Sequence, residues 1–111
     1  GPRFVRPANL SRRPSPASGA QAQLQACIQE NYPRQARTQG VEGRVDAALQ
    51  IGPSGAIMGV RVRSESVRGQ GFGAVCRRCL SNVPAWTPPL DRQGTPVATT
   101  FPAFCEFNVN Y

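Results

Sequence analysis

Two segments of alternating hydrophobic and polar residues, 42–51 and 57–64, flank a Gly-Pro-Ser-Gly turn at residues 52–55. A period of two is typical of a β-strand with one buried face. Proline and glycine supply the backbone angles that a tight turn needs. The sequence therefore predicts an antiparallel hairpin. In its second strand, the expected inward residues are Met58, Val60 and Val62, and the expected outward residues are Arg61 and Arg63.

Helical periodicity precedes and follows this hairpin. In residues 21–30, hydrophobic residues at i, i+3 and i+4 predict a helix, which resumes after an interruption and runs to about Gln39, with Asn31 as the cap of the second part. Residues 72–83 carry hydrophobic residues on one face at steps of three and four, so a second helix is expected there, ended by Pro84.

A last strand is predicted over residues 97–109, where alternate positions are again hydrophobic. Phe101 and Phe107 are expected to face the core. Pro102 lies inside this strand and has no N–H to donate to a neighbour. Such a proline is tolerated at a sheet edge, so the last strand is expected to be an edge strand.

The order helix, strand, strand, helix, strand predicts an α+β fold. We expect a three-stranded antiparallel sheet of order 2-1-3, with two helices packed on one face, within one domain over residues 21–111. Residues 1–20 are expected to lie outside it. Gly1-Pro2 is similar to the remnant of a cleaved tag, and the Pro-, Arg- and Ser-rich stretch that follows predicts a disordered linker.

The composition argues against most enzyme classes. The chain has thirteen arginines and six carboxylates, a formal charge of +7, and neither lysine nor histidine. It therefore lacks the commonest general base, the commonest zinc ligand and the amine of Schiff-base chemistry. We expect no enzyme activity, no cofactor and no metal. The arginines are scattered and accompany no nucleic-acid-binding motif, so nucleic acid is not an expected partner.

Six short motifs, in this order, resemble the C-terminal domain of TonB-type energy transducers over residues 31–110. They are Tyr32-Pro33-x-x-Ala36, Gly40-x-Glu42-Gly43-x-Val45, the turn at 52–55, Val60-x-Val62-x-x-Ser, Gly69-x-Gly71-Phe72, and Trp86-x-Pro88 with Gly94-x-Pro96-Val97. The chain departs from the pattern at Pro84, where a tryptophan is usual. Its cysteines are more similar to those of gliding-motility relatives.

The resemblance implies a periplasmic binding module of an inner-membrane-anchored protein. Such a module grips a TonB-box-like extended peptide of an outer-membrane receptor by strand addition to its last strand, and it passes on force from inner-membrane motor proteins that contact the N-terminal region. An unpaired strand edge suits this task, because it exposes a row of N–H and C=O groups. The expected peptide-binding residues are Tyr32, Thr100, Pro102, Phe104, Glu106 and Asn108. An alternative is a structural adaptor of a gliding-type envelope machine with the same fold.

The four cysteines allow three interpretations. Cys76-x-x-Cys79 is the spacing of a redox dithiol, which would make the chain a thiol oxidoreductase, but it lies inside the predicted helix rather than at its start. Four cysteines could also form a zinc site, although Cys27 and Cys105 are isolated. The third interpretation is a pair of structural disulfides. Tracing the predicted strands up and down the sheet favours the pairs Cys27–Cys79 and Cys76–Cys105, which do not cross.

Overall fold

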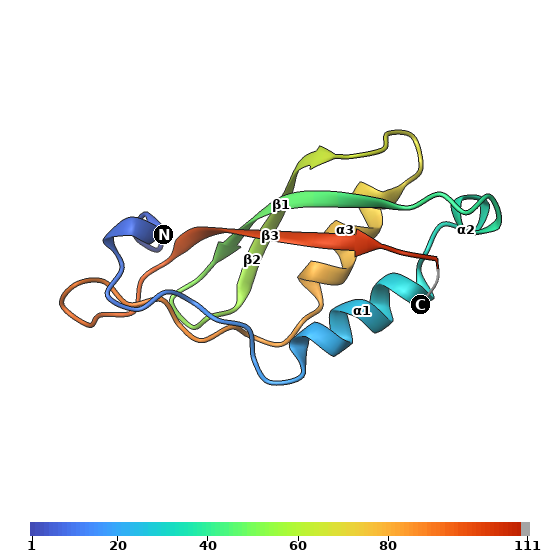
Figure 1. The fold of residues 1–111 in the computed structure, drawn as a ribbon. Coiled ribbons are helices and arrows are strands. Elements are labelled where there is room, and N and C mark those ends of the chain that lie inside the picture. Colours follow the sequence, from blue (N-terminus) through green and yellow to red (C-terminus); the bar gives the residue numbers. More distant parts are fainter. Residues whose placement is uncertain (110–111) are drawn as a thin grey trace.

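Three antiparallel strands form the sheet of the computed structural model, which describes residues 1–109, and their order is β2-β1-β3 (Figure 1). The strands are β1 (Gly43–Ile51), β2 (Ile57–Glu65) and β3 (Thr99–Phe107). β1 pairs with both neighbours, so β2 and β3 are the two edges. The predicted α+β fold class and the strand order 2-1-3 are confirmed. The last strand is shorter than predicted at both ends, running over Thr99–Phe107 instead of 97–109.

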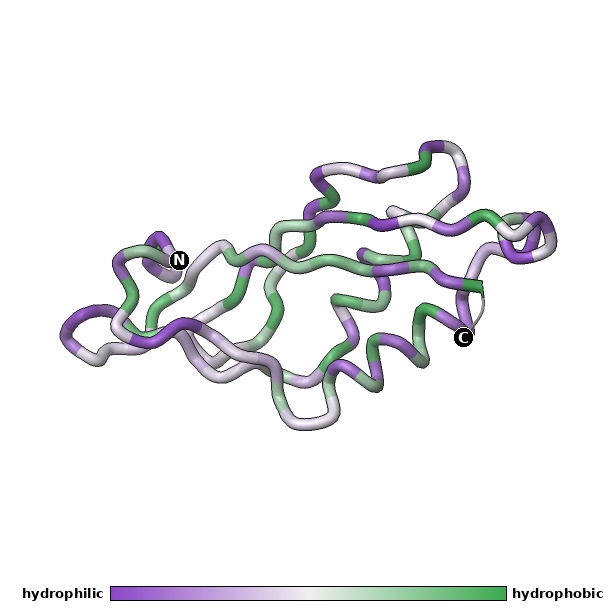
Figure 2. Tube along the Cα trace, in the orientation of Figure 1, coloured by the Kyte–Doolittle hydropathy of each residue, from purple (hydrophilic) through white to green (hydrophobic). Residues whose placement is uncertain are grey.

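Two helices, α1 (Ala20–Glu30) and α3 (Phe72–Ser81), cover one face of this sheet (Figure 1). Figure 2 shows both helices alternating between hydrophilic and hydrophobic segments, which is typical of helices with one buried face. Two short helices complete the fold, η1 (Pro7–Asn9) and α2 (Arg34–Thr38). As predicted, α3 ends before Pro84.

The predicted capping role of Asn31 is wrong. The side-chain amide of Asn31 donates to the carbonyl oxygen of Cys27 at 2.9 Å, so it closes the end of α1. α2 begins three residues later, directly after Pro33, whose φ of −56° already suits a helix. The proline ring thus sets the start of α2, and the side chain of Asn31 lies too early in the chain to reach it.

An aromatic cluster formed by Tyr32, Phe72 and Phe107 fills the core at the end of the sheet where β1 begins and β3 ends. The rings of Phe72 and Phe107 are stacked with centroids 4.2 Å apart, and Tyr32 meets each of them edge-on at 5.6 and 5.5 Å. Val45, Leu49 and Ile51 of β1 are fully buried beside the helices. The buried face that the alternation in residues 42–51 predicts is therefore confirmed.

The predicted inward position of Met58 is wrong, because 46% of this residue is exposed. Gln50 pairs with Gly59, whereas Ile51 pairs with Ile57, so the ladder skips Met58 at a bulge. A bulge of one residue shifts the alternation by one position. Ile57 consequently packs against the core in place of Met58.

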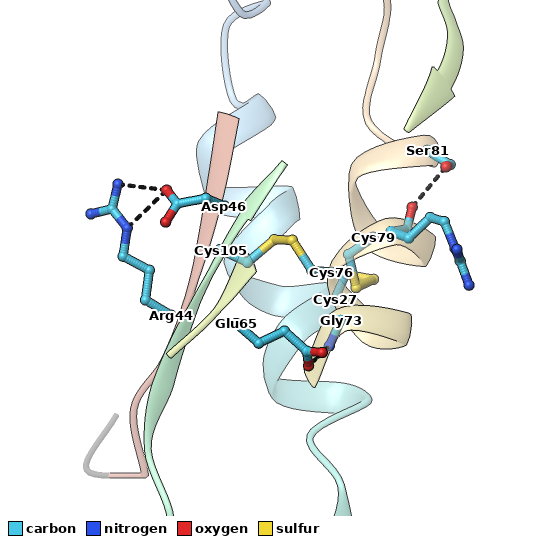
Figure 3. Close-up of a disulfide and its surroundings, with 10 residues drawn as sticks. Cys27, Arg44, Asp46, Glu65, Gly73, Cys76, Cys79, Ser81 and Cys105 are labelled. Carbon is cyan, nitrogen blue, oxygen red and sulfur yellow. Dashed lines mark hydrogen bonds and ion pairs between the residues drawn. A yellow bond between two sulfur atoms is a disulfide. The ribbon is translucent and has the colours of Figure 1, made fainter. Parts of the chain in front are cut away.

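Two disulfides connect the helices to each other and to the sheet (Figure 3). Cys27 of α1 is bonded to Cys79 of α3, and Cys76 of α3 is bonded to Cys105 of β3. These are the pairs that the topology predicts. Each cysteine of the CxxC sequence has a partner outside that sequence, which contradicts both the redox dithiol and the four-cysteine zinc site in this state of the chain.

Residues 3–15 follow the loop that leads from α3 to β3, although the two segments are far apart in the sequence (Figure 1). Backbone hydrogen bonds join Ser11 and Arg12 to Leu90. The guanidinium group of Arg12 donates to the carbonyl oxygen of Pro88 at 2.7 Å. A segment whose composition predicts a linker thus has a defined path here, because its polar groups find partners on the loop. Its disorder in solution stays a prediction.

Candidate functional site

The outer edge of β3 is one of the two edges of the sheet, the other being that of β2. On one side, β3 pairs with β1 without interruption from Thr99, opposite Ile51, to Phe107, opposite Gly43. On the other side, within residues 1–109, the backbone of residues 100–107 makes no hydrogen bond to another segment. This edge is therefore available for a further strand.

Ala98 identifies which residues of β3 point their backbone groups outward. The N–H of Ala98 donates to the carbonyl of Arg3, and its carbonyl accepts from the N–H of Val5, both at 2.9 Å. Backbone direction alternates along a strand, so Thr100, Pro102, Phe104 and Glu106 have the same outward phase as Ala98. Pro102 fits this phase because its missing N–H costs no bond to β1.

An apolar groove of about 200 Å³ runs beside this edge. Its walls come from the start of α1, the end of α3, the following loop and β3 itself. The residues that line it are Pro16, Ala20, Gln21, Leu24, Leu80, Val83, Trp86, Pro102, Ala103 and Phe104. The space is large enough for a side chain rather than only for a water molecule.

Trp86 forms part of the groove and is held in place by the β1–β2 turn. Its backbone N–H donates to the carbonyl of Gly55 at 2.8 Å, and its ring meets Phe101 edge-on at 6.1 Å. Gly55 has a φ of +88°, and a Cβ atom there would lie 1.8 Å from the carbonyl oxygen of Trp86. Only glycine permits this approach.

On the sheet face without helices, Phe104 is exposed and lies under a charged group. The guanidinium carbon of Arg44 is 4.0 Å from the centroid of the Phe104 ring. Arg44 also contacts Asp46 at 3.0 Å and Glu106 at 3.9 Å. Arg44 thus offsets one of the two negative charges beside this part of β3, and the exposed ring is its main apolar feature.

The family of known proteins described as "Gram-negative bacterial TonB protein C-terminal" matches residues 28–109 of the chain. The chain belongs to this family. TonB-type C-terminal domains are periplasmic, non-enzymatic interaction domains that contact outer-membrane receptors. No curated protein gives a significant match. Across residues 1–109, every helix falls short of the length and apolar character needed to cross a bilayer.

Most of the predicted peptide-binding residues lie together on this TonB-type domain. Thr100, Pro102 and Phe104 are exposed on β3, and Glu106 is half-buried on the same strand. Asn108 follows the end of β3, and its carbonyl oxygen accepts from the side chain of Gln29 at 3.3 Å. These five positions thus follow one edge of the sheet. Whether they contact a peptide stays a prediction.

Tyr32 lies apart from them, in the core of the TonB-type domain. It is 6% exposed, and its hydroxyl group donates to the carbonyl oxygen of Val41 at 2.7 Å. Burial raises the pKa of the Tyr32 phenol, and the charge of Glu42 adds to this effect against the opposing effect of Arg37. Tyr32 is therefore a neutral core residue and does not line the groove; its expected contact with a peptide stays a prediction.

Sequence reasoning missed the groove residues Leu24, Leu80 and Val83. They belong to the hydrophobic faces of the two predicted helices, and periodicity does not tell a core contact from a lining one. It also missed the contact of Arg3 and Val5 with Ala98. The signal for the groove was present in Trp86, an aromatic residue in a loop next to an expected edge strand.

Proposed function

We propose that this TonB-type domain binds an extended peptide of an outer-membrane receptor along the outer edge of β3. The observation that supports the proposal most directly is the unpaired backbone of residues 100–107 beside an apolar groove. An added strand would satisfy the outward N–H groups of Thr100, Phe104 and Glu106, and the outward carbonyl groups of these residues and Pro102.

Backbone pairing alone is insufficient for stable binding. Each hydrogen bond contributes roughly 0.5–1.5 kcal/mol net, so a handful of them contributes about as much as the lower estimates of the cost of association, roughly 4 kcal/mol. The groove supplies the missing term, because each Å² of apolar surface buried contributes about 25 cal/mol. The peptide is therefore expected to place one apolar side chain between α1 and the edge.

Pro102 makes the two halves of this edge unequal in the backbone hydrogen bonds that they can form. Because Pro102 offers a carbonyl but no N–H, one carbonyl of the added strand stays without a backbone donor at this position. Every other outward residue of the edge, including Phe104, offers both groups. Pairing is therefore expected to be strongest over the second half of β3, from Phe104 to Glu106.

The second part of the proposed function is the transmission of force between the membranes. Family membership and the cross-linked fold support it, because β3, the strand that would hold the receptor peptide, is connected to α1 through α3 by two disulfides. In this proposal, the chain on the N-terminal side of the domain connects it to motor proteins of the inner membrane.

An NMR titration with a defined probe tests strand addition. The probe is a five-residue peptide that alternates threonine and valine, acetylated and amidated at its ends. We expect amide shifts concentrated in residues 100–107 of the isotope-labelled chain. Shifts centred on β2, or an absence of shifts at millimolar peptide, would contradict the proposal.

Two substitutions at Phe104 separate the backbone contribution from that of the ring. Phe104→Pro removes the outward N–H, which an edge position tolerates, whereas Phe104→Ala removes the ring and keeps the N–H. Relative to Phe104→Ala, Phe104→Pro is expected to weaken binding by about fivefold, the equivalent of one net hydrogen bond of about 1 kcal/mol. Equal affinities for the two variants would exclude backbone pairing at this residue.

A further inference from the structure

The N-terminal segment already occupies one end of the β3 edge. Phe4 forms a parallel bridge with Ala98, and the backbone of Ala98 bonds to Arg3 and Val5 on the two sides of that bridge. Ala98 has the outward phase of the edge. Arg3–Val5 thus uses the same kind of backbone groups that an added strand would use at Thr100.

Two local features stop this parallel ladder after one bridge. The next bond would join the carbonyl of Val5 to the N–H of Thr100, but the hydroxyl group of Thr99 donates to that carbonyl at 2.6 Å. The bond after it would need an N–H at position 7, where Pro7 has none and begins η1. The edge beyond Ala98 therefore stays unpaired, while its first position is taken.

The contacts that hold Arg3–Val5 in place are mostly polar and only partly buried on the side of the segment. Arg3 forms an ion pair with Asp91 at 2.5 Å, but 63% of its side chain is exposed. Among residues 3–19, all of which the structure describes, only Pro14 is buried. Segments that bury little apolar surface open at a small cost in free energy. The segment can thus leave the edge without unfolding the domain.

We propose that Arg3–Val5 acts as an internal competitor for the first position of the receptor-binding edge. A partner strand that pairs only with residues 100–106 leaves the segment in place, whereas a longer strand that reaches Ala98 displaces it. This inference rests on the proposed strand addition. Because such coupling is reciprocal, detaching the N-terminal segment strengthens the binding of long strands and leaves the binding of short ones unchanged.

The experiment compares the five-residue threonine–valine peptide with an eleven-residue peptide of the same alternation. Both are titrated into the full chain and into two variants that loosen the segment. Val5→Pro removes the N–H that donates to the carbonyl oxygen of Ala98, and Arg3→Ala removes the ion pair with Asp91. Arg13→Ala is the matched control: it makes the same charge change in the same segment, at an exposed residue without a hydrogen bond or ion pair in the described part of the chain.

In the unsubstituted chain, the eleven-residue peptide is expected to shift the amide signals of Val5 and Ala98, and the five-residue peptide is not. Val5→Pro is expected to raise the affinity for the eleven-residue peptide about fivefold, which corresponds to one net backbone hydrogen bond, and to leave the five-residue affinity unchanged. Arg3→Ala is expected to have a smaller effect in the same direction, and Arg13→Ala none.

Two results would overturn the inference and separate it from the proposed function. If both peptides bind residues 100–107 and neither gains affinity in Val5→Pro or Arg3→Ala, strand addition stands and the internal competitor is excluded. If neither peptide shifts residues 100–107, the proposed function fails, and the inference that rests on it fails too. A gain for both peptides alike would assign the effect to the edge as a whole and would also exclude competition at Ala98.

Discussion

Two regions contact β3 in opposite ways. On the helix side, α1 and α3 are joined to it through Cys27–Cys79 and Cys76–Cys105, and they bury the aromatic cluster. On the outer side, residues 3–15 are attached along the loop before β3 by hydrogen bonds and one ion pair, mostly near solvent. The first attachment withstands large fluctuations, and the second can open alone. The difference separates global stability from local opening, and substitutions should affect the two independently.

The largest effect is expected from removing the Cys27–Cys79 disulfide. This bond closes a loop of 52 residues, so the double variant Cys27→Ala/Cys79→Ala should lose about 4 kcal/mol of unfolding free energy. Urea unfolding monitored by circular dichroism measures the loss. The Cys76–Cys105 disulfide closes a shorter loop of 29 residues, so the variant Cys76→Ala/Cys105→Ala should lose slightly less unfolding free energy. A larger loss in this second variant would contradict the chain-entropy explanation.

Gly55→Ala is expected to cost about 3 kcal/mol, because the new Cβ atom would overlap the carbonyl group of Trp86 and displace the loop that lines the groove. Gly94→Ala is the matched control. Gly94 has a similar φ of +81°, but a Cβ atom there meets nothing within 4 Å, so its cost should be about 1 kcal/mol of backbone strain. Equal losses of unfolding free energy in the two variants would show that the contact with Trp86 is unimportant.

A smaller and local effect is expected from Thr99→Val. This change keeps the shape of the side chain and removes the hydroxyl group that donates to the carbonyl oxygen of Val5. The free energy of local opening at Ala98, measured by amide hydrogen exchange, should fall by about 1 kcal/mol, with little change in the urea midpoint. Thr100→Val, at the exposed neighbouring position, should change neither quantity. A similar response in both variants would refute the role of the Thr99 hydroxyl group.

The smallest effect is expected from lowering the pH, which protonates Asp91. The backbone N–H of Thr95 lowers the pKa of Asp91, and the N–H of Gln93 and the charge of Arg3 act in the same direction against partial burial. A lowered pKa in the folded chain means that this stabilisation is complete above the ordinary aspartate pKa of about 3.9 and is lost as the pH falls through the lower, folded value.

The loop and the N-terminal segment should therefore loosen together only below about pH 4, the ordinary range of an aspartate. The amide shifts of Gln93 and Thr95, followed during an acid titration, measure this transition. Asp91→Asn should abolish it. A midpoint above the ordinary aspartate value would contradict the assigned hydrogen bonds.

Local patterns predicted most of the fold. The alternation around Leu49, the proline at position 102 and the helical spacing of the cysteines are properties of neighbouring residues, so strand order and cysteine pairing could be worked out from them. The exposure of Met58 could not be predicted, because it results from a bulge that depends on how β2 pairs with β1. The burial of Tyr32 could not be predicted for a similar reason, since its partners Phe72 and Phe107 lie far away in the sequence.

The candidate site was only half predictable. The edge follows from strand order and from Pro102, whereas the groove needs three separate segments to meet at Trp86. The contact of Arg3 with Asp91 spans nearly the whole chain, and composition alone describes this segment as a linker. Long-range polar contacts of this kind have no periodic signature, so only the folded structure reveals them.

The two disulfides also determine how the domain responds to tension. Between α1 and β3, the shortest covalent route crosses one turn of α3, from Cys79 to Cys76, and bypasses β1 and β2 entirely. A pull applied between the start of α1 and β3 would therefore stretch sulfur–sulfur and backbone bonds before it could shear the hairpin from the helices. In an oxidising compartment the β1–β2 hairpin thus carries little of the applied force. In a reducing compartment, where the disulfides are broken, the same force would act on the hydrophobic contacts of the core.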